Sequence, residues 1–70
     1  MRYAVVIEKA ANNYSAYVPD IPGCVATGST VEEVEQRIRE AIAFHLDGLR
    51  DDGLPTPRPS SHIEYVDIAV

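Results

Sequence analysis

Prolines divide this 70-residue chain and decide where regular structure can run. Pro19 and Pro22 stand close together in the first third, whereas Pro55, Pro57 and Pro59 follow one another near the end. Proline lacks the backbone N–H that a helix interior or a central strand must donate, so each cluster ends the element before it. Regular structure is therefore confined to three stretches: before the first cluster, between the two clusters, and after the second.

The residues on either side of the first cluster predict three short strands. Arg2 to Glu8 (RYAVVIE) is β-branched, aromatic and apolar on both faces, which is typical of a central strand. Tyr14 to Val18 (YSAYV) returns to strand composition after a turn that contains two asparagines, which predicts a hairpin. Cys24 to Gly28 (CVATG) is long enough for a third strand.

The segment PDIPG predicts a rigid corner between the second and third strands, formed by Pro19, Asp20, Pro22 and Gly23. The two prolines take the chain out of the sheet, and Gly23 permits a positive φ. The Asp20 carboxylate is expected to cap its own turn. Such a corner would fix the spacing of the strands and set the register of the third.

The middle of the chain predicts one helix, from about Val31 to about Asp52. Its start carries a capping-box pattern, which either of two pairs can supply: Ser29 with Glu32, or Thr30 with Glu33. Gly53 is the expected C′ residue, and the prolines beyond it forbid continuation. Residues at helical spacing form one stripe that is expected to pack on the sheet: Val31, Val34, Ile38, Ala41, Ile42, His45 and Leu49.

The end of the chain predicts a fourth strand. Leu54 to His62 is a proline-stiffened connection, and Ile63 to Val70 (IEYVDIAV) alternates as a strand does. The order strand, helix, strand implies a right-handed crossover. We therefore expect an α+β fold (an α/β arrangement of two layers) in the order β-β-β-α-β, with a four-stranded mixed sheet and one helix packed on one face. A single domain would span residues 1–70.

Self-association is expected because so short a chain buries little apolar surface. The single cysteine, Cys24, excludes an internal disulfide and offers no thiol pair for zinc. One helix also leaves the opposite, partly apolar face of the sheet uncovered. We expect a homo-oligomer, either a dimer or a tetramer.

The charge balance favours a basic protein partner. Eleven acidic and six basic residues give a formal charge of -5, which repels nucleic-acid phosphates. Phe44 lies about 120° from the centre of the apolar stripe, among charged residues that are mostly acidic: Glu33, Arg37, Glu40 and Asp47. The candidate partner-binding residues share that side of the helix: Glu40, Phe44, Asp47 and Asp51. The alternative is an ordinary solvated helix face. With no signal-peptide pattern or membrane-length apolar run, we expect a cytoplasmic protein that does not bind membranes.

We predict no catalytic residue, no cofactor and no metal site. Cys24 follows a glycine turn and is better explained as a small core residue than as a nucleophile. His45 falls in the apolar stripe, where packing is the simpler explanation.

These motifs together resemble the HicB antitoxin family over essentially the whole chain. The resemblance rests on PDIPGC at the corner, GSTVEE at the helix start, and HLDGL followed by GLPTPRPS at the helix end. It implies a partial ribonuclease H-like fold with the last strand beside the first. It also implies a HicA-type partner, a small basic toxin with a double-stranded-RNA-binding fold that degrades messenger RNA. The implied function is that of an antitoxin covering the toxin's active surface.

Two alternatives stay open: an orphan self-assembling HicB-like scaffold with an unknown protein partner, and a ribonuclease H-like nuclease. The nuclease would need several carboxylates converging on two Mg²⁺ ions, and the first strand offers only Glu8 at its end. Many family members carry a DNA-binding domain after this one, whereas this chain ends at Val70. Direct binding of operator DNA is therefore not expected.

Overall fold

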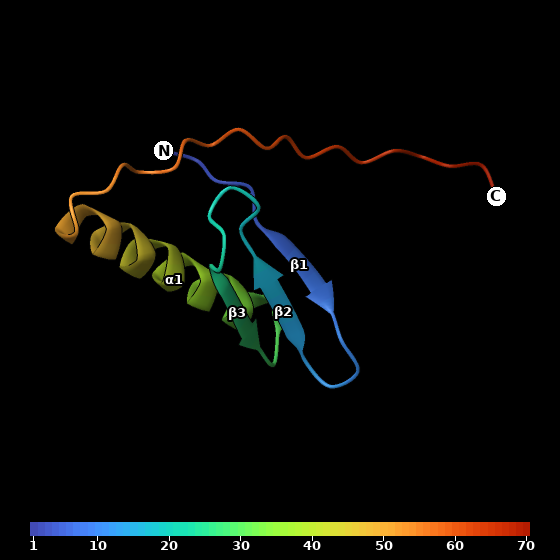
Figure 1. Ribbon diagram of the computed structural model, residues 1–70. Coiled ribbons are helices and arrows are strands. Elements are labelled where there is room, and N and C mark those ends of the chain that lie inside the picture. The colour runs from blue at the N-terminus through green and yellow to red at the C-terminus, as the bar shows by residue number, and fades with distance from the viewer.

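A computed structural model describes residues 1–70 as a three-stranded antiparallel sheet covered on one face by one helix (Figure 1). The strands are β1 (Val6–Lys9), β2 (Tyr14–Tyr17) and β3 (Val25–Gly28), and the helix is α1 (Val31–Asp51). The α+β class, the hairpin and the helix on one face agree with the sequence prediction. The number of strands does not.

The predicted fourth strand is absent. Ile63–Val70 has no strand partner, and this segment runs along the top of Figure 1 to a C-terminus far from the sheet. A strand is stabilised by hydrogen bonds to a neighbour, so an alternating pattern without a neighbour remains an extended chain. The four-stranded mixed sheet is therefore wrong for the single chain, which holds three antiparallel strands.

The predicted central position of the first strand is wrong. β1 begins at Val6 rather than Arg2 and lies at the edge, and β2 is the central strand. The two faces of β1 are apolar for a reason other than a central position in the sheet. Ile7 packs toward the core below α1, whereas Val6 joins the outer face, where it pairs with Tyr17 of β2. Apolar character on both faces therefore does not place a strand in the middle of this sheet.

The core lies between the sheet and the first half of α1. Its buried residues come from β2, the corner, the start of β3 and the helix: Ala16, Val18, Ile21, Cys24, Val34 and Ile38. Ile21, at 0% exposure, is the corner's contribution. Leu46, which the predicted stripe omitted, packs against this core, whereas Val31 is 39% exposed.

The corner has the backbone that its glycine predicted. Gly23 adopts a φ of 82°. The N–H of Val18 donates to the Cys24 carbonyl at 3.1 Å, and the N–H of Cys24 donates to the Ile21 carbonyl at 3.1 Å. These bonds hold the end of β2 beside the start of β3, so the corner fixes the strand spacing.

Both ends of α1 are capped by side chain and backbone. The capping box is made by Thr30 and Glu33, because Thr30 Oγ1 accepts from the Glu33 N–H at 3.0 Å and Glu33 Oε1 accepts from the Ser29 N–H at 2.9 Å. Glu32, also predicted, takes no part in the box. At the other end Gly53 has a φ of 71°, and its N–H donates to the Arg50 carbonyl. α1 has no stretch apolar enough to cross a membrane.

Candidate protein-binding site

The outer face of the sheet carries an apolar row. Val6 pairs with Tyr17 across β1 and β2, and Tyr17 pairs with Val25 across β2 and β3, so the three side chains stand side by side. Tyr17 is 42% exposed and Val25 is 65% exposed. α1 lies on the other face, and no second layer covers this row. Its apolar residues are available to a partner.

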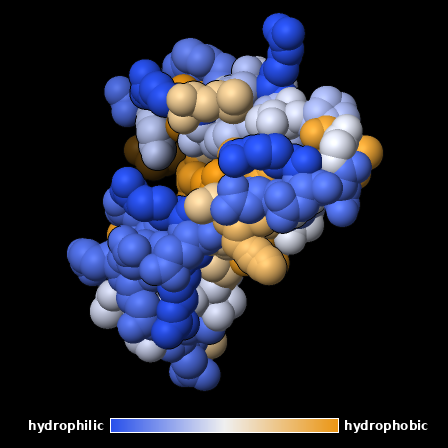
Figure 2. Space-filling model, turned by 90° about the vertical axis from the view of Figure 1, so that its left-hand side faces the viewer, coloured by the Kyte–Doolittle hydropathy of each residue, from blue (hydrophilic) through white to orange (hydrophobic).

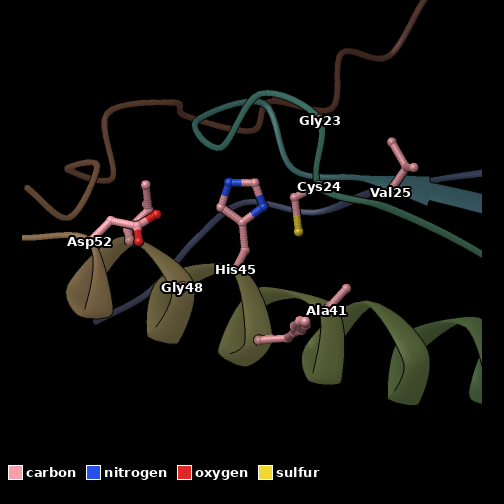
Figure 3. A pocket seen from close by; sticks show the side chains of 9 residues that line it. Gly23, Cys24, Val25, Ala41, His45, Gly48 and Asp52 are labelled. Carbon is pink, nitrogen blue, oxygen red and sulfur yellow. The ribbon is translucent and has the colours of Figure 1, made fainter. Parts of the chain in front are cut away.

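A hollow of about 420 Å³ opens between the corner and the C-terminal half of α1 (Figure 3). Its lining combines small and apolar residues with a few polar ones: Gly23, Cys24, Val25, Ala41, Phe44, His45, Gly48, Leu49 and Asp52. Ala41 and Gly48 have little or no side chain, which leaves open space between the helix and the corner. Figure 2, which views the molecule from the C-terminal end of α1, shows hydrophobic residues recessed within a mostly hydrophilic surface.

Cys24 and His45 lie near each other at this hollow: the Cys24 side chain points toward α1, and the imidazole of His45 rises from α1 toward the corner (Figure 3). Burial raises the pKa of the Cys24 thiol, which keeps it in the neutral form that is a poor nucleophile. Cys24 is 3% exposed and belongs to the core cluster, as the packing interpretation predicted. In the whole chain no three His, Cys, Asp or Glu side chains gather to hold a metal ion.

The four predicted partner residues lie on one exposed side of α1, at spacings that repeat with the helical turn: Glu40, Phe44, Asp47 and Asp51. Phe44 is 70% exposed and borders the hollow. Glu40 accepts a hydrogen bond from Gln36 at 3.0 Å, and Asp47 forms an exposed ion pair with Arg50 at 3.3 Å. The structure thus gathers these residues on one surface, and their contact with a partner stays a prediction.

The sequence predicts that the Asp20 carboxylate caps its own turn, and this prediction is wrong. The carboxylate instead accepts four hydrogen bonds from the C-terminal segment: from the Ser60 N–H and Oγ at 2.9 and 3.1 Å, and from the Ser61 N–H and Oγ at 3.0 and 2.7 Å. These donors lower the pKa of Asp20 to about 2, the Ser61 N–H most of all. Sequence reasoning missed this pairing, because the partners stand forty or more residues apart and carry no shared local pattern.

A second hydrogen-bonded contact also attaches the segment that follows α1 to the rest of the chain. The Tyr3 hydroxyl donates a hydrogen bond to the Pro57 carbonyl. Together with Asp20, it fastens the proline-rich connection across the start of the chain. The predicted corner is therefore also an anchor for the segment that follows α1.

An open outer row, a hollow beside an exposed aromatic residue and an acidic helix side are the features of a small protein-binding module. The comparisons with known proteins specify which kind. The chain belongs to the HicB-like antitoxin family of bacterial toxin–antitoxin systems, whose family model matches residues 3–69.

Proteins from a phage, a bacterium and archaea are similar to this chain in sequence. A 14.9 kDa protein from the rep–hol intergenic region of Haemophilus phage HP1 is 36% identical over 66 residues, which cover 94% of this chain and 50% of that protein. The chain thus spans half the length of that phage relative. A UPF0150 protein of Helicobacter pylori strain J99 is 42% identical over 65 residues, covering 91% of this chain and 90% of the relative.

The fold has a solved counterpart. A chain of a structure described as a HicA3 and HicB3 toxin–antitoxin complex superposes with a TM-score of 0.72 and 33% sequence identity. The match covers 84% of this chain and 70% of that one. The likeness at this identity supports kinship as well as a shared fold.

Proposed function

We propose that this protein is an antitoxin that binds and neutralises a HicA-type, messenger-RNA-degrading toxin, acting as a homo-oligomer in the cytoplasm where such a toxin meets its substrate. The observation that carries the proposal is the structural likeness, over 84% of the chain, to a chain of a toxin–antitoxin complex. The family match over residues 3–69 supports it independently.

The proposed mechanism is coverage rather than catalysis. A formal charge of -5 attracts a basic toxin and speeds the encounter. The side of α1 that carries Asp47 and Asp51 offers charge, and Phe44 offers an exposed aromatic anchor beside the hollow. An aromatic centre with a charged rim is the arrangement that concentrates binding energy in protein interfaces. We expect the toxin to seat there.

Co-expression tests this function directly. A HicA-type toxin should arrest growth when expressed alone, and this protein should restore growth and co-purify with the toxin. Asp51→Lys should slow association about three- to tenfold at low ionic strength, with the difference shrinking as salt is added. Glu32→Lys, the same charge reversal on an exposed acid at the opposite end of α1, is the matched control and should change association less. Restored growth without physical association would contradict the proposed coverage.

The orphan-scaffold alternative is favoured by a separate observation. Only 7 of 70 residues are buried, and the outer row of the sheet is open, which is the condition of a chain that self-assembles. A stable oligomer that captures no HicA-type toxin would favour this alternative over the antitoxin.

A further inference from the structure

The C-terminal segment Ile63–Val70 is shaped as a strand but has no partner. Its apolar residues are strongly exposed: Tyr65 at 92%, Val66 at 73% and Ile68 at 71%. At its root the imidazole of His62 and the carboxylate of Glu64 lie 2.8 Å apart, which places side chains two residues apart on the same side, as in an extended chain. The root of the segment therefore has the extended geometry that a sheet would accept, and the rest of the tail runs on as an extended chain (Figure 1).

The free edge of β1 offers a place for such a strand. β1 pairs only with β2, so its outward backbone groups have no partner in the sheet. Beside it lies a groove of about 390 Å³ between the start of the chain and α1. Five apolar or aromatic side chains line it, with Glu35 and Arg39 also present: Tyr3, Val5, Ile7, Ile38 and Ile42. An open edge beside an apolar groove is the arrangement into which an added strand fits.

The chain's own tail does not take this place. Ser61, His62 and Ile63 pass beside Arg2, Tyr3 and Ala4, just before β1 begins. From there the tail continues away from the sheet (Figure 1). The radius of gyration is 13.8 Å, against about 11 Å for a compact chain of this length. The longest extent is 49 Å. The hydrogen bonds from Ser60 and Ser61 to the Asp20 carboxylate, here called the Asp20 clamp, thus fix the root of the tail. The remainder of the tail projects away from the sheet and the helix.

We propose that Ile63–Val70 is donated to a second copy of the chain, where it pairs with the free edge of β1 and covers the groove, and that the exchange is reciprocal. Val66, Ile68 and Val70 share one side of the extended tail and would enter the groove, because alternate residues of a strand face the same way. Reciprocal exchange closes a twofold dimer in which each copy gives and receives one strand. This exchange rests on the homo-oligomer of the proposed function and specifies how that oligomer forms. It does not require a toxin.

A second copy is the occupant that the structure favours. The tail and the groove belong to the same sequence, so both are present in equal number and each satisfies the other's unpaired backbone and apolar surface. The tail's length also fits, because its extended run from Ile63 to Val70 matches the stretch from Tyr3 to Lys9 that borders the groove and edge. The competing occupants, the chain's own tail or a toxin strand, give different results in the test below.

Light scattering coupled to size-exclusion chromatography tests the exchange on the full chain. The unmodified protein should be a dimer at micromolar concentration, and Ile68→Lys should be a monomer with unchanged helical circular dichroism. Ala69→Lys, which adds the same charge at the neighbouring position on the opposite side of the tail, is the matched control and should remain a dimer.

Complementation separates exchange from pairing within one chain. Val5→Lys damages the groove and leaves the tail intact, whereas Ile68→Lys does the reverse. Mixing the two monomers should restore a heterodimer held by one intact tail in one intact groove, which pairing within each chain cannot achieve. A monomeric unmodified protein, a dimeric Ile68→Lys variant, or a mixture that stays monomeric would each overturn the proposal. Toxin capture by monomeric Ile68→Lys would leave the antitoxin proposal standing.

Discussion

Asp20 and Ser61 are joined by two hydrogen bonds, one from the Ser61 hydroxyl at 2.7 Å and one from the Ser61 N–H at 3.0 Å. They stand forty-one residues apart in sequence. Asp20 belongs to the corner that connects β2 to β3, and Ser61 precedes the projecting tail. The pair therefore connects the geometry of the sheet with the direction in which the chain leaves it.

Removing the Asp20 charge should loosen the root of the tail. In Asp20→Asn the amide keeps one acceptor oxygen, so it cannot serve four donors. Amide hydrogen exchange at Ser60 and Ser61 should therefore become faster, while the helix amides stay protected. Asp67→Asn, the same change at a tail acid that accepts no hydrogen bond in the structure, should leave both serines as they were. Unchanged exchange in Asp20→Asn would show that the clamp does not form in solution.

The clamp also predicts how stability depends on pH. The pKa of Asp20 is lowered from 3.8 to about 2, chiefly by the N–H groups of Ser61 and Ser60. The folded pKa lies below the unfolded one, so the ionised carboxylate stabilises the fold fully above about pH 4 and loses this effect as the pH falls through 2. The stability difference between the unmodified protein and Asp20→Asn should shrink across this window. A difference that grows toward low pH would contradict the assignment.

Two glycines should respond oppositely to the same substitution. A Cβ at Gly28 would lie 2.8 Å from the backbone nitrogen of Val34, whereas a Cβ at Gly48 meets nothing within 4 Å. Gly28→Ala should therefore destabilise by about 1–3 kcal/mol, because the helix backbone must shift. Gly48→Ala should stabilise by about 0.5–1 kcal/mol by favouring the helix. Urea unfolding measures both, and equal midpoints would refute the close approach.

The helix start distinguishes a side-chain cap from its neighbour. Thr30 Oγ1 accepts the Glu33 N–H, whereas Ser29 contributes its backbone N–H to the box. Thr30→Ala should cost about 1 kcal/mol of folding free energy, and Ser29→Ala should cost much less. Thermal unfolding of the two variants provides the comparison. A larger loss in Ser29→Ala would move the N-cap by one residue.

Phe44 should matter for binding and not for folding. Because its side chain is 70% exposed, Phe44→Ala should change the free energy of unfolding by less than about 0.5 kcal/mol. The affinity of the Phe44→Ala variant for a HicA-type toxin should fall about tenfold or more if Phe44 is the anchor. Leu54→Ala, which trims another exposed apolar residue just beyond α1, is the control for affinity. Equal affinities of the Phe44→Ala and Leu54→Ala variants for the toxin would show that Phe44 is not the anchor.

The features that sequence predicted well are those fixed by neighbouring residues. The corner follows from Pro22 and the positive φ of Gly23, and the helix follows from Thr30, Glu33 and the φ of Gly53. Each of these signals acts within a few residues, so composition and spacing are sufficient to recognise it.

The features that sequence reasoning missed depend on distant parts of the chain. The alternation of Ile63–Val70 predicts a strand but cannot say whether a neighbour exists within the same molecule. The apolar faces of the first strand are compatible with a central or an edge position, and only the pairing with β2 decides. The partners of Asp20 come from the far end of the chain. Of the candidate site, sequence predicted that Phe44 and its acidic neighbours share one exposed side of α1, and their role in binding stays a prediction; it did not predict the hydrogen bonds of Asp20.

The contact between Gly28 and the first turn of α1 has a consequence for recognition. With the Gly28 Cα beside the backbone of Val34, sheet and helix meet without an intervening side chain and have little freedom to slide. An incoming molecule thus encounters a platform whose shape is already set before contact. A flexible receptor loses conformational entropy when it binds, whereas this protein has already lost that entropy on folding. This favours long-lived complexes over adaptable ones.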